Sequence, residues 1–340
     1  MDMQSAIQHV IARQALTEAD MQSVMQTIMS GQATPAQIGG FLVGLRMKGE
    51  SIDEITAAAK VMRQLASPVD IAGPHVVDTC GTGGDGAKSF NISTASAFVV
   101  AAAGGKVAKH GNRSVSSQSG SADVLEVLGV NIQLTPEQVS ECVQRTGVGF
   151  MFAPLFHSAM KHAIGPRREL GVRTLFNVLG PLTNPANAPC QVLGVYDKAL
   201  LAPLATVLKN LGSQHVMVVH AEDGMDEISI SGRTWVSELK AGVITAQTLH
   251  PSDVGLELAP IEQIGVETAA ESAALIQQIF RGESNSGARD VVILNAGAAI
   301  YVSGLAATLG EGCGLAEAVI REGKAAAKVT QLIEVSQSFQ

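Results

Sequence analysis

A glycine-rich turn after a short apolar run constrains the fold of this chain more than any other feature. VVDTC at residues 76–80 is followed by GTGGDG at residues 81–86 and then by a helical segment from Ser93 to Ala103. A second strand is predicted from Lys106 to Ala108, and a polar loop separates it from a helix at residues 122–128. This alternation of strand and helix is typical of a parallel sheet that binds ligands at the carboxyl ends of its strands.

Later segments repeat the alternation. Thr135-Pro136 predicts another helix start, and strands are predicted at residues 192–196, 216–219 and 291–294, the last of them before a terminal alanine-rich helix. The sequence therefore predicts an α/β domain with a mostly parallel central sheet over residues 73–340.

Residues 1–72 predict a separate helical domain. Thr17, Thr34 and Ser51 each precede a segment with helical periodicity and with an acidic or amide residue three positions later, and no strand pattern interrupts them. Short helices are marginal alone, so these must pack together or against another surface. Residues 157–185 are also helical, and helices from about residue 160 to 187 are candidates to join this domain.

Composition excludes several classes of protein. With 340 residues, 46% of them hydrophobic and 16% charged, the chain is long enough for about two globular domains. Aromatic residues make up 4% and the net charge is −8, which argues against nucleic-acid binding. Four cysteines without a C-x-x-C pair, at positions 80, 142, 190 and 313, suggest neither zinc nor disulfides. No targeting or membrane-spanning pattern is evident, so we expect a cytoplasmic protein.

Acidic residues are absent from Gly86 to Ala122, although the chain is acidic overall. The same stretch has nine Ser and Thr hydroxyls and four basic residues, Lys88, Lys106, Lys109 and Arg113. This composition predicts a pocket for a polyanion, to which the glycine-rich turn would offer backbone N–H groups and a helix N-terminus. The alternative is a tight turn followed by a solvated serine-rich loop.

Two common phosphate-binding motifs do not fit. The turn matches G-x-G-x-x-G, but a dinucleotide site also needs an acidic residue about 20 positions later, and the next acid after Asp85 is Asp123. A P-loop needs Gly-Lys-Ser/Thr, whereas Ala87 separates Gly86 from Lys88. A nicotinamide cofactor is therefore disfavoured, and a nucleoside triphosphatase is rejected.

Longer strings resemble the anthranilate phosphoribosyltransferase family of tryptophan biosynthesis. They are GTGGD (81–85), NIST (91–94), KHGNRSVSS (109–117), RRELGVRT (167–174), FNVLGPLTNPA (176–186) and Asp226-Glu227. The resemblance covers nearly the whole chain in the family's order. It departs at Ser89, where Thr is more usual, and at Gly165-Pro166, where Pro-Val is expected.

The resemblance implies a helical domain joined to an α/β domain, as in type II nucleoside phosphorylases, and a homodimer formed through the helical domains. The implied reaction transfers the phosphoribosyl group of 5-phosphoribosyl 1-diphosphate to anthranilate, with Mg²⁺ as the metal. Two alternatives remain, a pyrimidine nucleoside phosphorylase and a nucleic-acid-binding relative of the same fold. The KHGNRSVSS and NIST strings favour the transferase, and this acidic chain shows no basic stripe for nucleic acid.

The resemblance also implies the site residues. The phosphoribosyl donor is bound by Gly81, Gly84, Asp85, Ser89, Asn91, Ile92, Ser93, Thr94, Lys109, His110, Gly111, Asn112, Arg113, Ser114, Val115, Ser116, Ser117 and Ser121. Anthranilate is bound by Gly81, Asn112 and Arg167, and Mg²⁺ by Ser93, Asp226 and Glu227. No catalytic residue is firmly assigned. His110 and His157 are candidates, because imidazole can orient an amine or accept its proton.

These residue types suit the implied chemistry. Loss of pyrophosphate places positive charge on the sugar and negative charge on the leaving group, which amides, hydroxyls, Lys109 and Mg²⁺ can neutralise. The aromatic amine has a free lone pair at neutral pH, so the attack needs no strong base. A guanidinium fork at Arg167 suits a carboxylate, the alternative being plain surface charge. Asp226 and Glu227 can share one metal only if the backbone turns there, the alternative being a solvated acidic turn.

Overall fold

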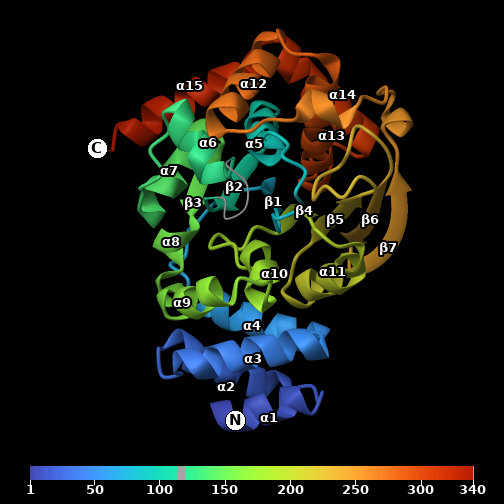
Figure 1. Cartoon of the computed structure of the whole chain (residues 1–340). Helices are drawn as coiled ribbons and strands as arrows, with labels where there is room; N and C mark the ends of the chain where they lie inside the picture. Colours follow the sequence, from blue (N-terminus) through green and yellow to red (C-terminus); the bar gives the residue numbers. More distant parts are fainter. Residues whose placement is uncertain (114–118, 340) are drawn as a thin grey trace.

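The computed structural model describes residues 1–113 and 119–339 (Figure 1). Ser114, Val115, Ser116 and Ser117 of the predicted donor site lie outside the described residues. At the N-terminal end, helices pack together beneath the α/β body; they are α1 (Met3–Ile11), α2 (Glu18–Met29), α3 (Pro35–Lys48) and α4 (Ile52–Leu65).

Side-chain caps explain where these helices begin. Thr34 and Gln37 form a reciprocal capping box at the start of α3, and Ser51 and Glu54 form another at the start of α4. Thr17 caps α2 by accepting the Asp20 backbone N–H. The three predicted helix starts are therefore confirmed, and α1 is an additional helix that the sequence did not single out.

In the part of the chain that the structure describes, seven strands form one sheet, in the order β3-β2-β1-β4-β5-β6-β7. They are β1 (Val76–Gly81), β2 (Lys106–Gly111), β3 (Val148–Phe152), β4 (Cys190–Gly194), β5 (His215–Ala221), β6 (Thr234–Lys240) and β7 (Val243–Leu249). The first five are parallel, and β6 and β7 add an antiparallel edge. The predicted mostly parallel sheet is confirmed, and the carboxyl ends of β1, β2, β4 and β5 meet at one edge.

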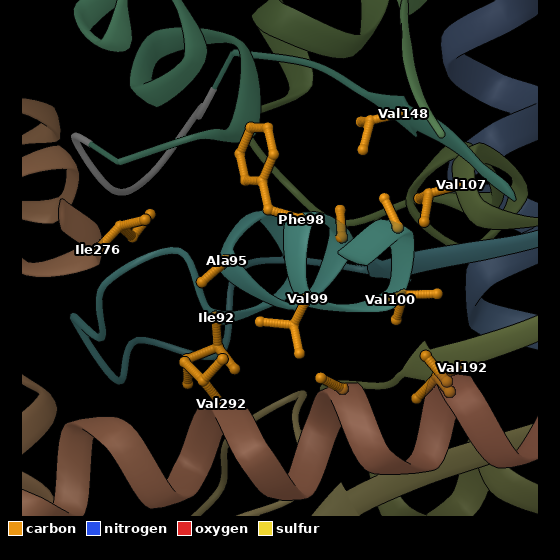
Figure 2. Close-up of a cluster of buried hydrophobic side chains, with 14 of the residues drawn as sticks. Ile92, Ala95, Phe98, Val99, Val100, Val107, Val148, Val192, Ile276 and Val292 are labelled. Atoms are coloured by element: carbon orange, nitrogen blue, oxygen red, sulfur yellow. The ribbon is translucent and has the colours of Figure 1, made fainter. Parts of the chain in front are cut away.

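The two faces of the sheet are covered by different helices. Val192 and Met217 pack on one face with α5 (Ile92–Ala102) and α13 (Ser286–Val302), whereas Leu193 and Val218 pack on the other with the N-terminal helices. Figure 2 shows the side chains of α5 between the sheet and α13. Neighbouring strand residues thus enter opposite cores, as the period of two in a strand requires.

The remaining helices complete both layers. They are α6 (Ser121–Leu128), α7 (Pro136–Thr146), α8 (Ala153–Phe156), α9 (Lys161–Leu170), α10 (Leu175–Leu182), α11 (Leu201–Asn210), α12 (Ala269–Arg281), α14 (Leu309–Arg321) and α15 (Lys324–Gln337). Short 3₁₀ turns span Ser158–Met160, Lys198–Leu200, Pro251–Val254 and Ile261–Ile264. α9 packs on α2 and α3, and α10 packs on α3 and α4. No helix in residues 1–113 and 119–339 combines the length and the hydropathy needed to cross a membrane.

Two predictions about elements are wrong. Residues 291–294 form part of the buried helix α13, which Asn285 caps, and not a strand. A short apolar run does not distinguish a strand from a helix buried on all sides. β2 also continues to Gly111, so Lys109 and His110 lie in the strand rather than in the polar loop.

Candidate active site

Two glycines allow the turn that contains Asp226 and Glu227, called the acidic turn below, to lie directly against the carboxyl edge of the sheet. Gly81 ends β1 and Gly194 ends β4, and the two residues are partners in the parallel register. A Cβ atom at Gly81 would overlap the Asp226 carboxylate, and one at Gly194 would overlap the Asp226 carbonyl oxygen. Only glycine therefore permits this close approach of the Asp226 turn.

Asp226 joins this acidic turn to the glycine-rich loop at residues 82–86. Asp226 and Glu227 lie between the antiparallel strands β5 and β6, where the backbone turns as a shared metal would require. Asp226 Oδ2 accepts the Gly83 backbone N–H at 2.6 Å, and the Asp226 backbone N–H donates to Asp85 Oδ2 at 3.4 Å. Three carboxyl groups from two loops are thus brought to one place.

The carboxyl groups of the acidic turn do not have enough positive charge around them to keep their pKa values in the ordinary range. Burial and the nearby Asp85 raise the pKa of Asp226 to about 7, and burial and Asp226 raise the pKa of Glu227 to about 8. Among the described residues, no three His, Cys, Asp or Glu side chains are arranged to hold a metal by themselves. Mg²⁺ in proteins commonly takes one or two carboxylates together with substrate phosphates and water, so Asp226 and Glu227 fit such a site.

Without a bound cation, stability is expected to fall as the pH rises from 6.5 to 8. The folded-state pKa values of Asp226 and Glu227, about 7 and 8, exceed those of unfolded carboxyls, so the folded state binds more protons and loses stability as they ionise. His110 and His157, with lowered pKa values of about 3 and 4, oppose this trend only below the ordinary histidine pKa of 6.5.

Thermal unfolding at pH 6.5 and pH 8 measures this effect. The double variant Asp226→Asn, Glu227→Gln should show a smaller loss over this interval, because it carries neither titrating carboxyl. An equal loss in the wild type and in the variant would contradict the assignment.

Lys109 is an interior cation that ties three elements together. Its side chain lies inside the protein, and its Nζ donates to the Thr79 carbonyl oxygen of β1 and, at 3.0 Å, to Ser93 Oγ at the start of α5. Burial lowers the pKa of Lys109, and the negative charges of Asp78 and Glu227 partly oppose this shift. Lys109 therefore lies between the β1 strand, the helix N-terminus and the acidic turn.

Asn91 connects the start of α5 to the second loop. Its Oδ1 accepts the Thr94 backbone N–H at 3.0 Å and the Ser93 hydroxyl at 3.2 Å, and its Nδ2 donates to the Ser119 carbonyl oxygen at 2.9 Å. The Ser119 hydroxyl in turn donates to the Ser89 carbonyl oxygen at 3.4 Å. The segments that follow β1 and β2 therefore lie side by side at the same edge of the sheet.

Arg113 is predicted to bind the phosphoribosyl donor. In the structure its positive charge is already paired with carboxylates of the chain. Its guanidinium pairs with Asp123 at 3.0 Å and also with Glu126, both on α6, and it lies 5.6 Å from the centre of the Phe152 ring. Its neighbour Asn112 accepts a hydrogen bond from Ser121 Oγ through its carbonyl oxygen. The structure thus anchors Arg113 to helix α6.

His110 and His157 form a pair of buried neutral imidazoles. Their ring centroids are 5.0 Å apart, and their exposed fractions are 7% and 6%. Burial lowers the pKa of His110 to about 3 and that of His157 to about 4. Within the described residues neither Nε2 atom has a hydrogen-bond partner. Such orphaned atoms are rare in folded proteins, so each nitrogen is a candidate for a hydrogen bond that the described residues do not supply.

Arg167 has an unmatched charge in a half-buried position. It lies on α9, and its guanidinium is 5.1 Å from the centre of the Phe176 ring. Burial lowers its pKa, and no carboxylate of residues 1–113 and 119–339 pairs with it. The next residue, Arg168, is exposed on the same helix.

Comparisons with known proteins agree with this geometry. Residues 4–66 match a family model described as the helical bundle domain of a glycosyl transferase family, and residues 73–326 match the α/β domain of that family. Anthranilate phosphoribosyltransferase from Thioalkalivibrio sulfidiphilus is 61% identical over 338 residues, which cover 99% of this chain and 100% of that one. The chain belongs to the anthranilate phosphoribosyltransferase family.

Solved structures of anthranilate phosphoribosyltransferases share the whole fold. The Thermus thermophilus enzyme is 42% identical with a TM-score of 0.92, and the match covers 98% of this chain and 99% of that one. The Saccharomyces cerevisiae enzyme, solved in complex with PRPP and Mg, is 28% identical with a TM-score of 0.90 over 99% of this chain and 98% of that one. These relatives support the transferase over the nucleoside phosphorylase and the nucleic-acid-binding protein.

Other polar residues at this edge of the family fold were not among the site residues predicted from the sequence. Asp78 is fully buried and accepts Asn184 Nδ2 at 2.7 Å and the His110 backbone N–H at 3.3 Å. A charged residue inside an apolar run was the available signal for Asp78. Arg173 donates to the Gly84 carbonyl oxygen and lies 4.0 Å from the Tyr196 ring centre. Asn184 and Arg173 both belong to strings that the sequence singled out, but only folding shows their partners.

Proposed function

We propose that this chain transfers the phosphoribosyl group from 5-phosphoribosyl 1-diphosphate to anthranilate, giving N-(5-phosphoribosyl)anthranilate and pyrophosphate in tryptophan biosynthesis. The observation that carries this proposal is the junction of the glycine-rich loop, the start of α5 and the acidic turn at one sheet edge. Backbone N–H groups and a helix N-terminus there suit phosphates, and carboxylates beside them suit Mg²⁺. The yeast relative solved in complex with PRPP and Mg supports PRPP and Mg²⁺ as ligands of this chain.

The donor would lie between the two loops. We assign to it the described members of the set implied by the family resemblance: Gly81, Gly84, Asp85, Ser89, Asn91, Ile92, Ser93, Thr94, Lys109, His110, Gly111, Asn112, Arg113 and Ser121. Asn91 supports this assignment, because its side chain fixes the helix start and the second loop at once. The role of Arg113 depends on its exchanging a carboxylate of α6 for a phosphate.

Asp226, Glu227 and Ser93 are the residues we propose to hold Mg²⁺. When bound, Mg²⁺ supplies positive charge that stabilises the departing pyrophosphate. The Ser93 backbone N–H lies at the Glu227 carboxylate, and the Lys109 ammonium lies at the Ser93 hydroxyl. The chain thereby orients one metal-binding carboxylate from the same helix start that faces the phosphates.

Anthranilate would bind through Gly81, Asn112 and Arg167. The unmatched guanidinium of Arg167 can bind the carboxylate in a bidentate manner. The amine attacks the anomeric carbon with its own lone pair as the bond to pyrophosphate breaks, and the new C–N bond leaves a surplus proton on nitrogen. We propose that the unpartnered Nε2 of His110 or His157 orients the amine and accepts this proton.

A fluorescence assay tests the proposed reaction. Anthranilate fluorescence should decrease only when the protein, the phosphoribosyl donor and Mg²⁺ are all present. Pyrimidine nucleosides with inorganic phosphate, supplied instead, should give no turnover. Nucleoside cleavage without anthranilate consumption would replace the proposal by a phosphorylase.

Arg167→Ala is expected to raise the KM for anthranilate and to leave the KM for the donor near the wild-type value. The loss should correspond to roughly 1.5 to 3 kcal/mol, the usual effect of removing a charged hydrogen-bond donor. Steady-state kinetics with each substrate varied in turn measures both constants. Arg168→Ala is the matched control, since Arg168 is exposed on the same helix. Unchanged anthranilate kinetics in Arg167→Ala would make this residue plain surface charge.

Domain organisation and assembly are part of the same proposal. Residues 1–72, with the helices from about 160 to 187, would form the helical domain, and residues 73–340 the α/β domain.

We propose a homodimer through the helical domain, because Ile11 on α1 and Met47 on α3 are each 71% exposed. Light scattering should give twice the mass of one chain, and Met47→Glu should shift the protein toward monomer. A monomeric wild-type protein would contradict this. The cytoplasmic location stays a prediction.

A further inference from the structure

Asn295 binds the backbone of Ile228, the residue that follows the acidic turn. It lies on α13 and is 3% exposed. Its Oδ1 accepts the Ile228 backbone N–H at 2.9 Å, and its Nδ2 donates to the Ile228 carbonyl oxygen at 2.8 Å. A further bond to the Val291 carbonyl oxygen at 2.9 Å fixes the amide on its own helix. The side chain therefore pairs with both backbone groups of Ile228.

This pairing restrains the backbone next to Glu227, the residue that precedes Ile228. Glu227 and Asn295 line the same small cavity, whose other walls are Thr79, Cys80, Ser93, Ser96 and Val192. Ile228 is 1% exposed, so without Asn295 its N–H and carbonyl groups would lose buried partners. Asp226 is fixed from the other end by the Gly83 N–H. The acidic turn is thus restrained at both of its ends.

We propose that Asn295 is a positioning residue that sets the direction of the Asp226 and Glu227 carboxylates for Mg²⁺. The inference rests on the metal role given to these carboxylates in the proposed function. Residues that orient metal ligands typically change metal affinity or activity by about 10- to 100-fold when they are replaced. A purely structural residue would change stability and leave the magnesium dependence unchanged.

The experiment measures Mg²⁺ binding apart from turnover. Mg²⁺ is titrated into the full chain with inorganic pyrophosphate present, and the thermal unfolding temperature is followed. Asn295→Ala removes all three bonds, and Asn295→Leu removes them while keeping most of the volume. Both should raise the half-saturating Mg²⁺ concentration about ten-fold. Asn131→Ala is the matched control, because Asn131 also bonds backbone groups, of Ser336 and Gln133, but belongs to a different part of the fold.

Glu227→Gln separates this inference from the proposed function. If Glu227→Gln leaves the Mg²⁺ dependence at the wild-type value, the metal assignment itself is wrong. If Glu227→Gln shifts it and both Asn295 variants keep the wild-type dependence, only the positioning role is wrong. A lower unfolding temperature with unchanged Mg²⁺ dependence, or failure of both Asn295 variants to fold, would make Asn295 a structural residue and overturn the inference.

Discussion

Asp226→Asn and Glu227→Gln are each expected to lower kcat/KM roughly 100-fold and to raise the Mg²⁺ concentration needed for half-maximal rate. Asparagine keeps an oxygen that can accept the Gly83 N–H, so the first variant removes charge and little else. Burial and neighbouring carboxylates raise the pKa values of both groups, so a cation bound beside them would favour their ionised forms. A Mg²⁺ titration of turnover measures the effect.

Glu222→Gln is the control for these two variants. Glu222 lies in the same connection between β5 and β6, but it is exposed and paired with Arg233 at 2.7 Å on the surface. It should therefore follow the wild-type curve, because an exposed ion pair contributes little. If Asp226→Asn and Glu227→Gln follow that curve as well, the metal site lies elsewhere, and only the phosphate-loop part of the proposal remains.

The fold could be predicted where local signals act alone. The capping boxes at Thr34 and Ser51 fixed helix starts, and the alternation of strand and helix predicted the parallel sheet. The apolar run at residues 291–294 predicts a strand although it is helical, because a helix buried on all sides has no polar face to reveal its period. The end of β2 was misplaced because Lys109 is polar, and its burial depends on partners from β1 and α5.

The sequence motifs of the candidate site could be recognised from the sequence, but the contacts between them could not. The position of Asp226 against Gly81 and Gly194 depends on the register of β1 with β4, which no local pattern shows. Asn295 carries no signal in an apolar helix, since its role depends on the backbone of Ile228, 67 positions away. Buried polar side chains such as these are fixed by tertiary pairing, and so sequence reasoning finds them last.

Lys109→Met is expected to weaken both the fold and donor binding. The substitution removes the buried ammonium that favours the negative charges of Asp78 and Glu227 and leaves the Thr79 carbonyl oxygen without its donor, which typically costs about 1 to 3 kcal/mol. Chemical unfolding measures this loss of free energy. The KM for the donor should rise more than the KM for anthranilate, because Lys109 contacts Ser93 at the predicted phosphate-binding helix start.

A second substitution separates the two effects. Asp78→Asn in the Lys109→Met background removes the buried negative charge and keeps one acceptor oxygen, which can serve either the Asn184 amide or the His110 N–H. The double variant should recover part of the lost stability, since it no longer buries a carboxylate charge without a nearby cation. Donor binding should stay weak, because the ammonium is still missing. If it returns together with stability, or if both KM values change equally in Lys109→Met, Lys109 serves the fold and does not bind the donor.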